Sequence, residues 1–141
     1  MKFRIRLWHK IVLVLMAFGV AIVGFMVRLP SMFSGVDTEM HSLFYFLAAA
    51  FLNILFAKRN ILIHVVIFGL LYAFGVVIEY AQEYSNTFFH RRIHGNADPE
   101  DMYANLKGIM AFSALWLCYV VIAFTWNTIK GNKVEKTSTA E

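Results

Sequence analysis

The sequence predicts an all-α, polytopic membrane protein with four transmembrane helices and both termini in the cytoplasm. Hydrophobic residues make up 60% of the 141-residue chain and charged residues only 16%, which is far from the balance of a soluble domain. The apolar residues gather into four segments that are bordered by polar residues. Basic residues concentrate at alternate ends of those segments, and this asymmetry sets the predicted orientation.

The four apolar segments cover residues 7–27, 42–57, 61–78 and 106–126. A helix that crosses a bilayer needs about 20 mainly apolar residues, so the first, third and fourth segments are long enough. The second segment is short, and a re-entrant or interfacial segment is the alternative. Only residues 58–60, Lys-Arg-Asn, separate it from the third segment, and such a tight basic link favours a helical hairpin.

The basic residues divide unevenly between the two sides of this arrangement. Of the 13 Lys and Arg residues, nine precede the first segment or lie in its first turn, link the second to the third, or follow the fourth. The positive-inside rule therefore places both termini in the cytoplasm. The first segment is expected to be a retained span, because its apolar core exceeds the ~7–15 residues of a signal peptide and no small-x-small cleavage motif follows it.

The chain is expected to form a single four-helix transmembrane domain over residues 1–130, followed by a flexible cytoplasmic tail over residues 131–141. Cys118 is the one cysteine, which rules out an intramolecular disulfide and a paired-cysteine zinc site. The formal net charge of +4 is small and tied to the span ends, so no nucleic-acid binding is predicted.

Three pairs of polar residues stand at the predicted outer ends of the spans. Members of each pair are three or four residues apart, so on a helix they share one face. Charged groups beside a membrane span are unfavourable unless they have a polar partner or a function, so these pairs are the candidate site. The pairs are Asp37 with His41, Glu79 with Gln82, and Asp101 with Asn105.

The last span has a clear start signal in residues 98–101, Asp-Pro-Glu-Asp. This run combines an N-cap aspartate, a proline at the first helical position and acidic residues in the first turn. The helix would carry Asp101, Asn105 and Gly108 along one face into the membrane, and Gly108 would let a neighbouring backbone or a ligand approach. Capping alone is the alternative role for Asp101.

Glu79 and His41 are the strongest single candidates. Glu79 follows a long apolar run, where an unpaired carboxylate is costly to desolvate, and Gln82 comes one turn later. His41 stands one turn after Asp37, which could orient its imidazole, and one turn before Tyr45. The alternatives are snorkelling to the interface for Glu79 and a simple polar cap for His41.

A basic and aromatic loop over residues 84–97 contains Arg91 and Arg92. One interpretation is non-specific contact with anionic head groups, to which each basic residue contributes about 1 kcal/mol. The sharper interpretation is that one of these arginines holds a phosphate or carboxylate through two parallel hydrogen bonds.

The order and spacing of these motifs over residues 36–112 resemble the VanZ-like family of small bacterial integral membrane proteins. Two departures are visible: Thr38 stands where the family often has a lysine, and the arginine, which aligns to either Arg91 or Arg92, is farther from Asp101 than expected. The motifs are Asp37-x-x-x-His41-x-x-x-Tyr45, Ile78-Glu79-x-x-Gln82, the loop arginine, and Asp101-x-x-x-Asn105-x-x-Gly108.

The resemblance implies a four-helix protein of the bacterial inner membrane, with His41, Glu79, Gln82, Asp101 and Asn105 as its polar signature. The namesake of the family is associated with resistance to the glycopeptide teicoplanin, and the biochemical activity of most members is undefined. The resemblance therefore supports a cell-envelope role and names no reaction.

Three functions fit the residues. The first is recognition or modification of an anionic membrane lipid or a polyprenyl-phosphate-linked group at the outer leaflet. The second is an intramembrane acid/base or metal-assisted enzyme with His41, Glu79 and Asp101 as catalytic residues. The third is a structural clasp of polar helix ends. Histidine with two carboxylates is a plausible ligand set for a divalent ion, but no close ligand spacing occurs within one helix, so no metal or other cofactor is predicted.

A transporter is the least supported function, because the four short spans carry no charged residue near their middle. Asn53 and His64 are the only strongly polar residues deep on the predicted cytoplasmic side. Both are expected to make packing contacts. The sequence does not predict the oligomeric state.

Overall fold

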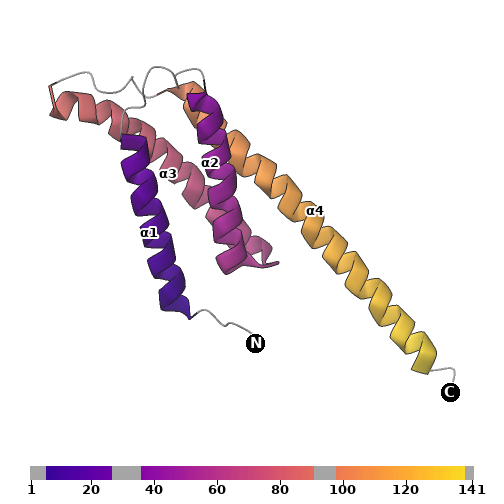
Figure 1. Cartoon of the computed structure of the whole chain (residues 1–141). Coiled ribbons are helices and arrows are strands. Elements are labelled where there is room, and N and C mark those ends of the chain that lie inside the picture. Colours follow the sequence, from indigo (N-terminus) through magenta and orange to yellow (C-terminus); the bar gives the residue numbers. More distant parts are fainter. Residues whose placement is uncertain (1–5, 27–35, 91–97, 139–141) are drawn as a thin grey trace.

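A computed structural model describes residues 6–26, 36–90 and 98–138, and every element in these ranges is helical. The helices are α1 (Leu7–Met26), α2 (Asp37–Leu52) with its π-helical continuation η2 (Asn53–Ala57), α3 (Ile61–Phe88) and α4 (Pro99–Ser138) (Figure 1). Four helical stretches are long and apolar enough to cross a membrane. The predicted all-α class with four candidate spans is therefore confirmed.

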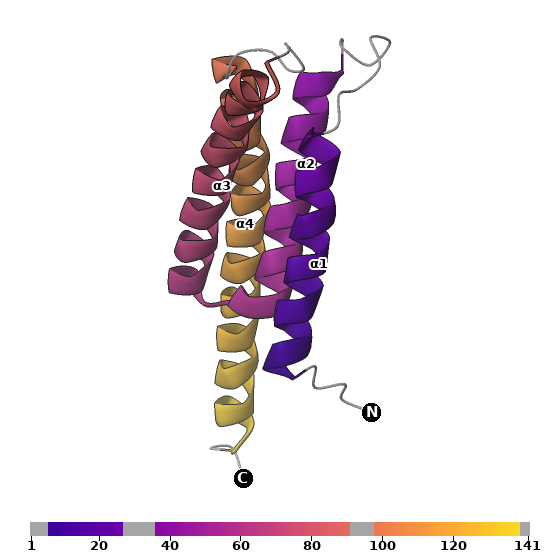
Figure 2. The same cartoon turned by 90° about the vertical axis from the view of Figure 1, so that its left-hand side faces the viewer.

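The helices alternate in direction (Figures 1 and 2). We call one end of the molecule the hairpin end, because residues 58–60 join η2 to α3 there, and α1 begins and α4 ends on the same side. We call the opposite end, where α2 and α4 begin, the acidic end, because Asp98 and Asp101 lie at the start of α4 and Glu79 contacts Asp98 there. The alternation brings residues far apart in sequence to the same end.

Several helices are longer than the apolar segments that predicted them. The second candidate span covers Thr38–Ala57, so it has the length of a full span, and its start includes the polar residues before position 42. The helix α3 continues past residue 78 to Phe88, and α4 continues past residue 130 through most of the segment predicted as a tail. Apolar patterning marks lipid-facing sequence, whereas a helix continues for as long as its backbone hydrogen bonds persist.

Side-chain caps explain where α3 and α4 begin. The Asn60 side chain accepts hydrogen bonds from the backbone N–H groups of Leu62 and Ile63, at 3.0 and 3.2 Å. Asp98 Oδ1 accepts from the N–H of Glu100 at 2.8 Å, and Pro99 is the first helical residue of α4. The predicted helix start at residues 98–101 is therefore confirmed.

The helices α2 and α4 pack most extensively, and Gly108 sets their separation. A Cβ atom added to Gly108 would lie 2.1 Å from the carbonyl oxygen of Ser42, so only glycine allows this approach. The buried core gathers around Tyr45, Leu71 and Ile109. Most other large apolar side chains are exposed, which is unfavourable in water and suits a surface solvated by lipid.

The hairpin end has a buried polar contact in which both side-chain polar atoms of Asn53 have partners. His64 Nδ1 lies 2.7 Å from Asn53 Oδ1, and Asn53 Nδ2 donates to the carbonyl oxygen of Ala49 at 2.8 Å. The His64 ring stacks on Trp116 at 4.1 Å, and Trp116 Nε1 donates to the carbonyl oxygen of Lys58 at 3.1 Å. Asn53 and His64 thus make buried packing contacts, as the sequence predicted.

Candidate functional site

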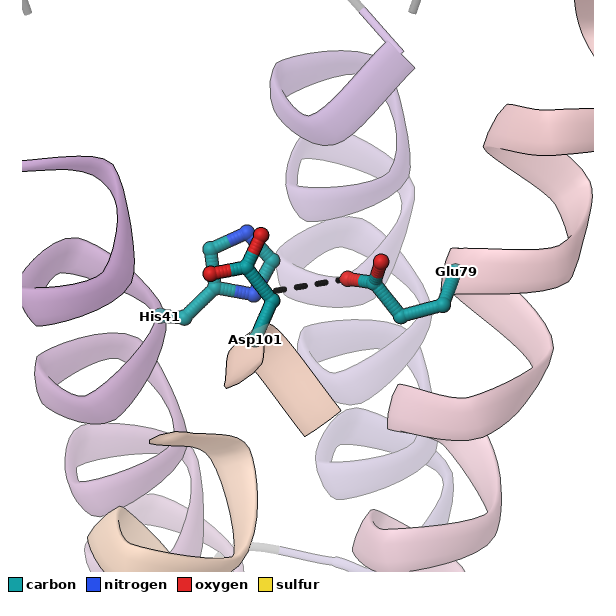
Figure 3. A group of neighbouring side chains, drawn as sticks. All are labelled: His41, Glu79 and Asp101. Carbon is teal, nitrogen blue, oxygen red and sulfur yellow. Dashed lines mark ion pairs between the residues drawn. The ribbon is translucent and has the colours of Figure 1, made fainter. Parts of the chain in front are cut away.

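Polar side chains from three helices meet at the acidic end (Figure 3). His41 comes from α2, Glu79 from α3, and Asp101 and Asn105 from α4. His41 is 4% exposed, Glu79 2% and Asn105 1%, while Asp101 is half-buried at the rim. We call these four residues the acidic-end cluster. Two ionisable side chains at such low exposure require specific partners, because burial removes the water that would solvate their charges.

The imidazole of His41 is held from two sides. Its Nδ1 atom lies 3.0 Å from Asn105 Oδ1 and 3.7 Å from Glu79 Oε1. Because an amide oxygen only accepts, the ring N–H donates to Asn105, and the lone pair of the neutral ring is then on Nε2. The Phe25 ring of α1 covers the imidazole at a centroid distance of 5.0 Å.

The first residues of α4 and α2 position the two carboxylates. The backbone N–H of Asp98 donates to Glu79 Oε2 at 3.3 Å, and Thr38 Oγ1 donates to Asp101 Oδ1 at 3.0 Å. One ligand atom each from His41, Glu79 and Asp101 lies within 4.8 Å of the other two. Figure 3 shows the Glu79 carboxylate pointing toward the imidazole, with Asp101 beside them.

Three buried polar atoms at this end have no hydrogen-bond partner among the described residues: Glu79 Oε1, Tyr45 Oη and Asn105 Nδ2. A buried polar group without a partner costs about 1–3 kcal/mol, so three of them in one place are unusual. Two of them converge on Gly75 of α3, where an added Cβ would lie 2.9 Å from Asn105 Nδ2 and 3.1 Å from Tyr45 Oη.

The two ends of the molecule hold similar buried pairs of histidine and asparagine. Each end holds a buried histidine whose Nδ1 bonds an asparagine Oδ1, namely His64 with Asn53 and His41 with Asn105. At the hairpin end Asn53 Nδ2 also has a partner, whereas Asn105 Nδ2 has none in the described chain. Both side-chain polar atoms of Asn53 therefore have hydrogen-bond partners, whereas Asn105 Nδ2 keeps the capacity to bind a further group.

Two residues predicted for the site lie against other partners. Gln82 Nε2 donates to the carbonyl oxygen of Phe25 at 2.8 Å, so it joins α3 to the end of α1. Gly108 lies against the backbone of α2 near Ser42. Both support the cluster from its border, Gln82 through α1 and Gly108 through the contact between α2 and α4.

The remaining predicted residues are described less fully. Asp37 is the first residue of α2, and its side chain lies outside the described part of the structure. Arg91 and Arg92 also lie outside the described residues. Among the described side chains, Asn105 orients His41, and the predicted contact of Asp37 with His41 stays a prediction.

Sequence reasoning missed three supporting residues. Thr38 lies three residues before His41, a spacing that places both on one face of α2, and this signal was available. Gly75 precedes Glu79 by one turn and shares its face of α3 in the same way. Phe25 carried no sequence signal, because nothing in an apolar run distinguishes the aromatic ring that covers a distant histidine.

No protein-family model matches this chain. Curated proteins and solved structures likewise provide no match for it. The resemblance to the VanZ-like family therefore rests on the spacing of motifs in the sequence and stays a prediction.

Proposed function

We propose that this chain is a VanZ-like protein of the bacterial inner membrane whose acidic end binds an anionic lipid-linked group, such as a polyprenyl phosphate, at the outer leaflet. The observation that carries the proposal is the convergence of His41, Glu79 and Asn105 with three buried polar atoms that lack partners among the described residues. The motif resemblance adds an expected link to glycopeptide (teicoplanin) resistance.

The orientation is inferred from the basic residues. The hairpin end carries Lys58 and Arg59, and the start of α1 and the end of α4 lie on the same side. Nine of the 13 basic residues belong to these segments in sequence, so the positive-inside rule supports a cytoplasmic hairpin end with both termini cytoplasmic. The acidic end then faces the outer leaflet.

Exposed aromatic residues support the location of the site at a membrane interface. They lie near the end of α3 and near the start of α4, close to the acidic-end cluster in sequence. Tyrosine and phenylalanine at such positions suit the boundary between head groups and acyl chains, where a lipid-linked ligand would present its polar group. The residues are Tyr80, Tyr84, Phe88, Phe89 and Tyr103.

Binding explains the cluster better than a structural clasp does. A clasp that only joins helices would gain stability from satisfying its polar atoms, as the His64–Asn53 pair does. The acidic-end cluster instead leaves Glu79 Oε1, at 2% exposure, with no hydrogen-bond partner in the described chain and only the 3.7 Å contact with His41 Nδ1. Such an arrangement is typical of sites that trade stability for function.

The test compares two matched histidine variants in lipid nanodiscs. We expect His41→Gln to weaken the binding of polyprenyl phosphate about tenfold or more, the effect of losing one hydrogen bond to a charged group. His64→Gln removes the equivalent buried histidine at the hairpin end and should leave binding unchanged. Equal affinity of the two variants, or equal affinity of the wild type for uncharged polyprenol, would contradict the proposal and favour the clasp.

A second candidate function is an intramembrane hydrolase or transferase. It is favoured by the orientation of His41, whose Nδ1 is held by Asn105 while Nε2 carries the lone pair. In a hydrolysis, His41 would take a proton from a water that attacks phosphorus, and Glu79 would protonate the leaving oxygen. Phosphate release from polyprenyl diphosphate by the wild type, absent in His41→Gln, would establish turnover; binding without release would exclude it for this substrate.

A further inference from the structure

The charge of the acidic-end cluster raises a difficulty for anion binding. Two carboxylates, those of Glu79 and Asp101, lie beside one imidazole, and a phosphate brought to them would be repelled. Such a site favours a cation, and a dication bound there would present the positive charge that an anionic group needs. Recognition of a phosphate at this site is therefore physically reasonable when a metal ion is bound.

We infer that His41, Glu79 and Asp101 bind a divalent metal ion, Zn²⁺ or Mn²⁺, to which the anionic group then coordinates. The bridging role rests on the proposed function, whereas the metal site rests on its own geometry. Imidazole nitrogen suits zinc and related ions, and carboxylate oxygen suits harder ions such as manganese. A set with one imidazole and two carboxylates is therefore compatible with either ion.

The three side chains are close to a chelating arrangement. One ligand atom of each residue lies within 4.8 Å of the other two. Because His41 Nδ1 donates to Asn105, the imidazole would bind the ion through the lone pair of Nε2. Ligands at about 2.0–2.2 Å from one zinc ion are roughly 3–4 Å apart, so a contraction of roughly 1 Å completes the set. Side-chain rotation supplies such a movement without any change in the helices.

A buried atom without a described partner points independently to a ligand. Glu79 is 2% exposed, its Oε1 atom has no hydrogen-bond partner in the described chain, and Figure 3 shows its carboxylate aimed at the other two side chains. A metal ion would bond this oxygen directly. A dication with two carboxylates and a neutral imidazole also carries no net charge, which lowers the cost of burying Glu79.

Each of the three metal ligands is held by one further hydrogen bond. Such outer partners orient the ligands of natural metal sites. All three are supplied by α2, by α4 or by the N-cap residue of α4, so the packing of these helices preorganises the set. The pairs are His41 with Asn105, Asp101 with Thr38, and Glu79 with the backbone N–H of Asp98.

Three protein ligands leave a coordination position for an incoming group. Catalytic zinc sites have this composition, with an exogenous oxygen in the remaining position. Tyr45 Oη and Asn105 Nδ2, both near Gly75 and both without a described partner, are hydrogen-bond donors available to an oxygen-rich ligand. The metal and these donors would together account for the three unpartnered atoms.

The test measures the binding of Zn²⁺ alone and of Mn²⁺ alone to the purified full-length protein, after chelation, by calorimetry and elemental analysis. We expect one ion per chain for the wild type and at least a tenfold loss of affinity in Asp101→Asn. Glu100→Gln removes an exposed carboxylate from the same helical turn and should bind normally. Fewer than one ion per two wild-type chains, or equal affinity of the two variants, overturns the inference.

A second variant excludes a folding artefact. Thr38→Val keeps all three metal ligands and removes only the hydrogen bond to Asp101, so we expect its metal affinity to fall about tenfold while its metal-free thermal midpoint stays near that of the wild type. If Thr38→Val binds the metal ion as tightly as the wild type, and Asp101→Asn loses affinity only because it is unfolded, the inferred site is contradicted.

Lipid binding with and without metal separates the two proposals. If polyprenyl phosphate binds more tightly with the metal than with chelator, both proposals are supported. If it binds equally in chelator, the bridging role is overturned and the proposed function remains. If the metal binds but polyprenyl phosphate does not, the proposed function is overturned and the metal site remains.

Discussion

Replacing Gly108 with alanine should separate α2 from α4 and disrupt the acidic-end cluster. The new Cβ would lie 2.1 Å from Ser42 O and 3.0 Å from Phe46 N, whereas ordinary contacts begin near 3.4 Å, so the helices must separate by about 1.3 Å at this point. Gly108 lies one turn from Asn105 and Ser42 directly follows His41. The 3.0 Å hydrogen bond between His41 and Asn105 would therefore lengthen beyond bonding distance.

The expected loss of stability follows from these contacts. Overpacking costs about 1–3 kcal/mol and the broken buried hydrogen bond about 1–2 kcal/mol, while alanine recovers up to about 1 kcal/mol of helix propensity. We expect a net loss of about 1–5 kcal/mol, which lowers the thermal midpoint in detergent by roughly 3–15 °C. Weaker binding of polyprenyl phosphate at the acidic end should accompany this loss of stability.

Gly69→Ala is the matched control, because a Cβ added to Gly69 meets nothing within 4 Å. The midpoint of this variant should stay the same or rise. Thermal unfolding followed by tryptophan fluorescence in one detergent compares the two variants directly. A Gly108→Ala protein as stable as Gly69→Ala would refute the close approach of α2 and α4.

Three further predictions concern other parts of the chain. Trp116→Phe removes the donor to the Lys58 carbonyl and should cost about 1 kcal/mol in unfolding free energy, whereas Trp126→Phe, at an exposed position, should cost nothing measurable. Lys58 has a φ of 51°, so Lys58→Gly should raise the thermal midpoint, while Arg59→Gly should not. Gly75→Ala should displace the two side chains that face it and weaken metal binding, with circular dichroism showing unchanged helix content; unaltered metal binding would contradict the site geometry.

The sequence was informative where local patterns decide the outcome. Residues 98–101 predicted the start of α4 correctly, because an N-cap, a first-turn proline and acidic residues act within one helical turn. Spacing alone predicted that Asp101 and Asn105 share one face of α4. The helices α3 and α4 continue beyond the apolar segments, since the loss of apolar character does not end a helix.

Contacts between helices do not follow from residue spacing within one helix. Gln82 shares a face with Glu79 yet bonds the carbonyl oxygen of Phe25 on α1, because spacing along one helix does not determine which neighbour each side chain reaches. No single helix contains closely spaced metal-ligand residues. That spacing could not reveal that His41, Glu79 and Asp101 come together from three different helices. Thr38 and Gly75 have roles only because α4 packs against them.

What the sequence by itself determined is the class of the protein: helices of span length, their alternating order, and the polar residues at one set of their ends. These follow from composition and local periodicity. Only the tertiary structure decided that His41 and Asn105, 64 residues apart, would share a hydrogen bond, and that Glu79 would be buried beside them with one oxygen unpartnered in the described chain. The physical reason is that convergence depends on how closely helices pack, and here the missing side chain of Gly108 sets that distance.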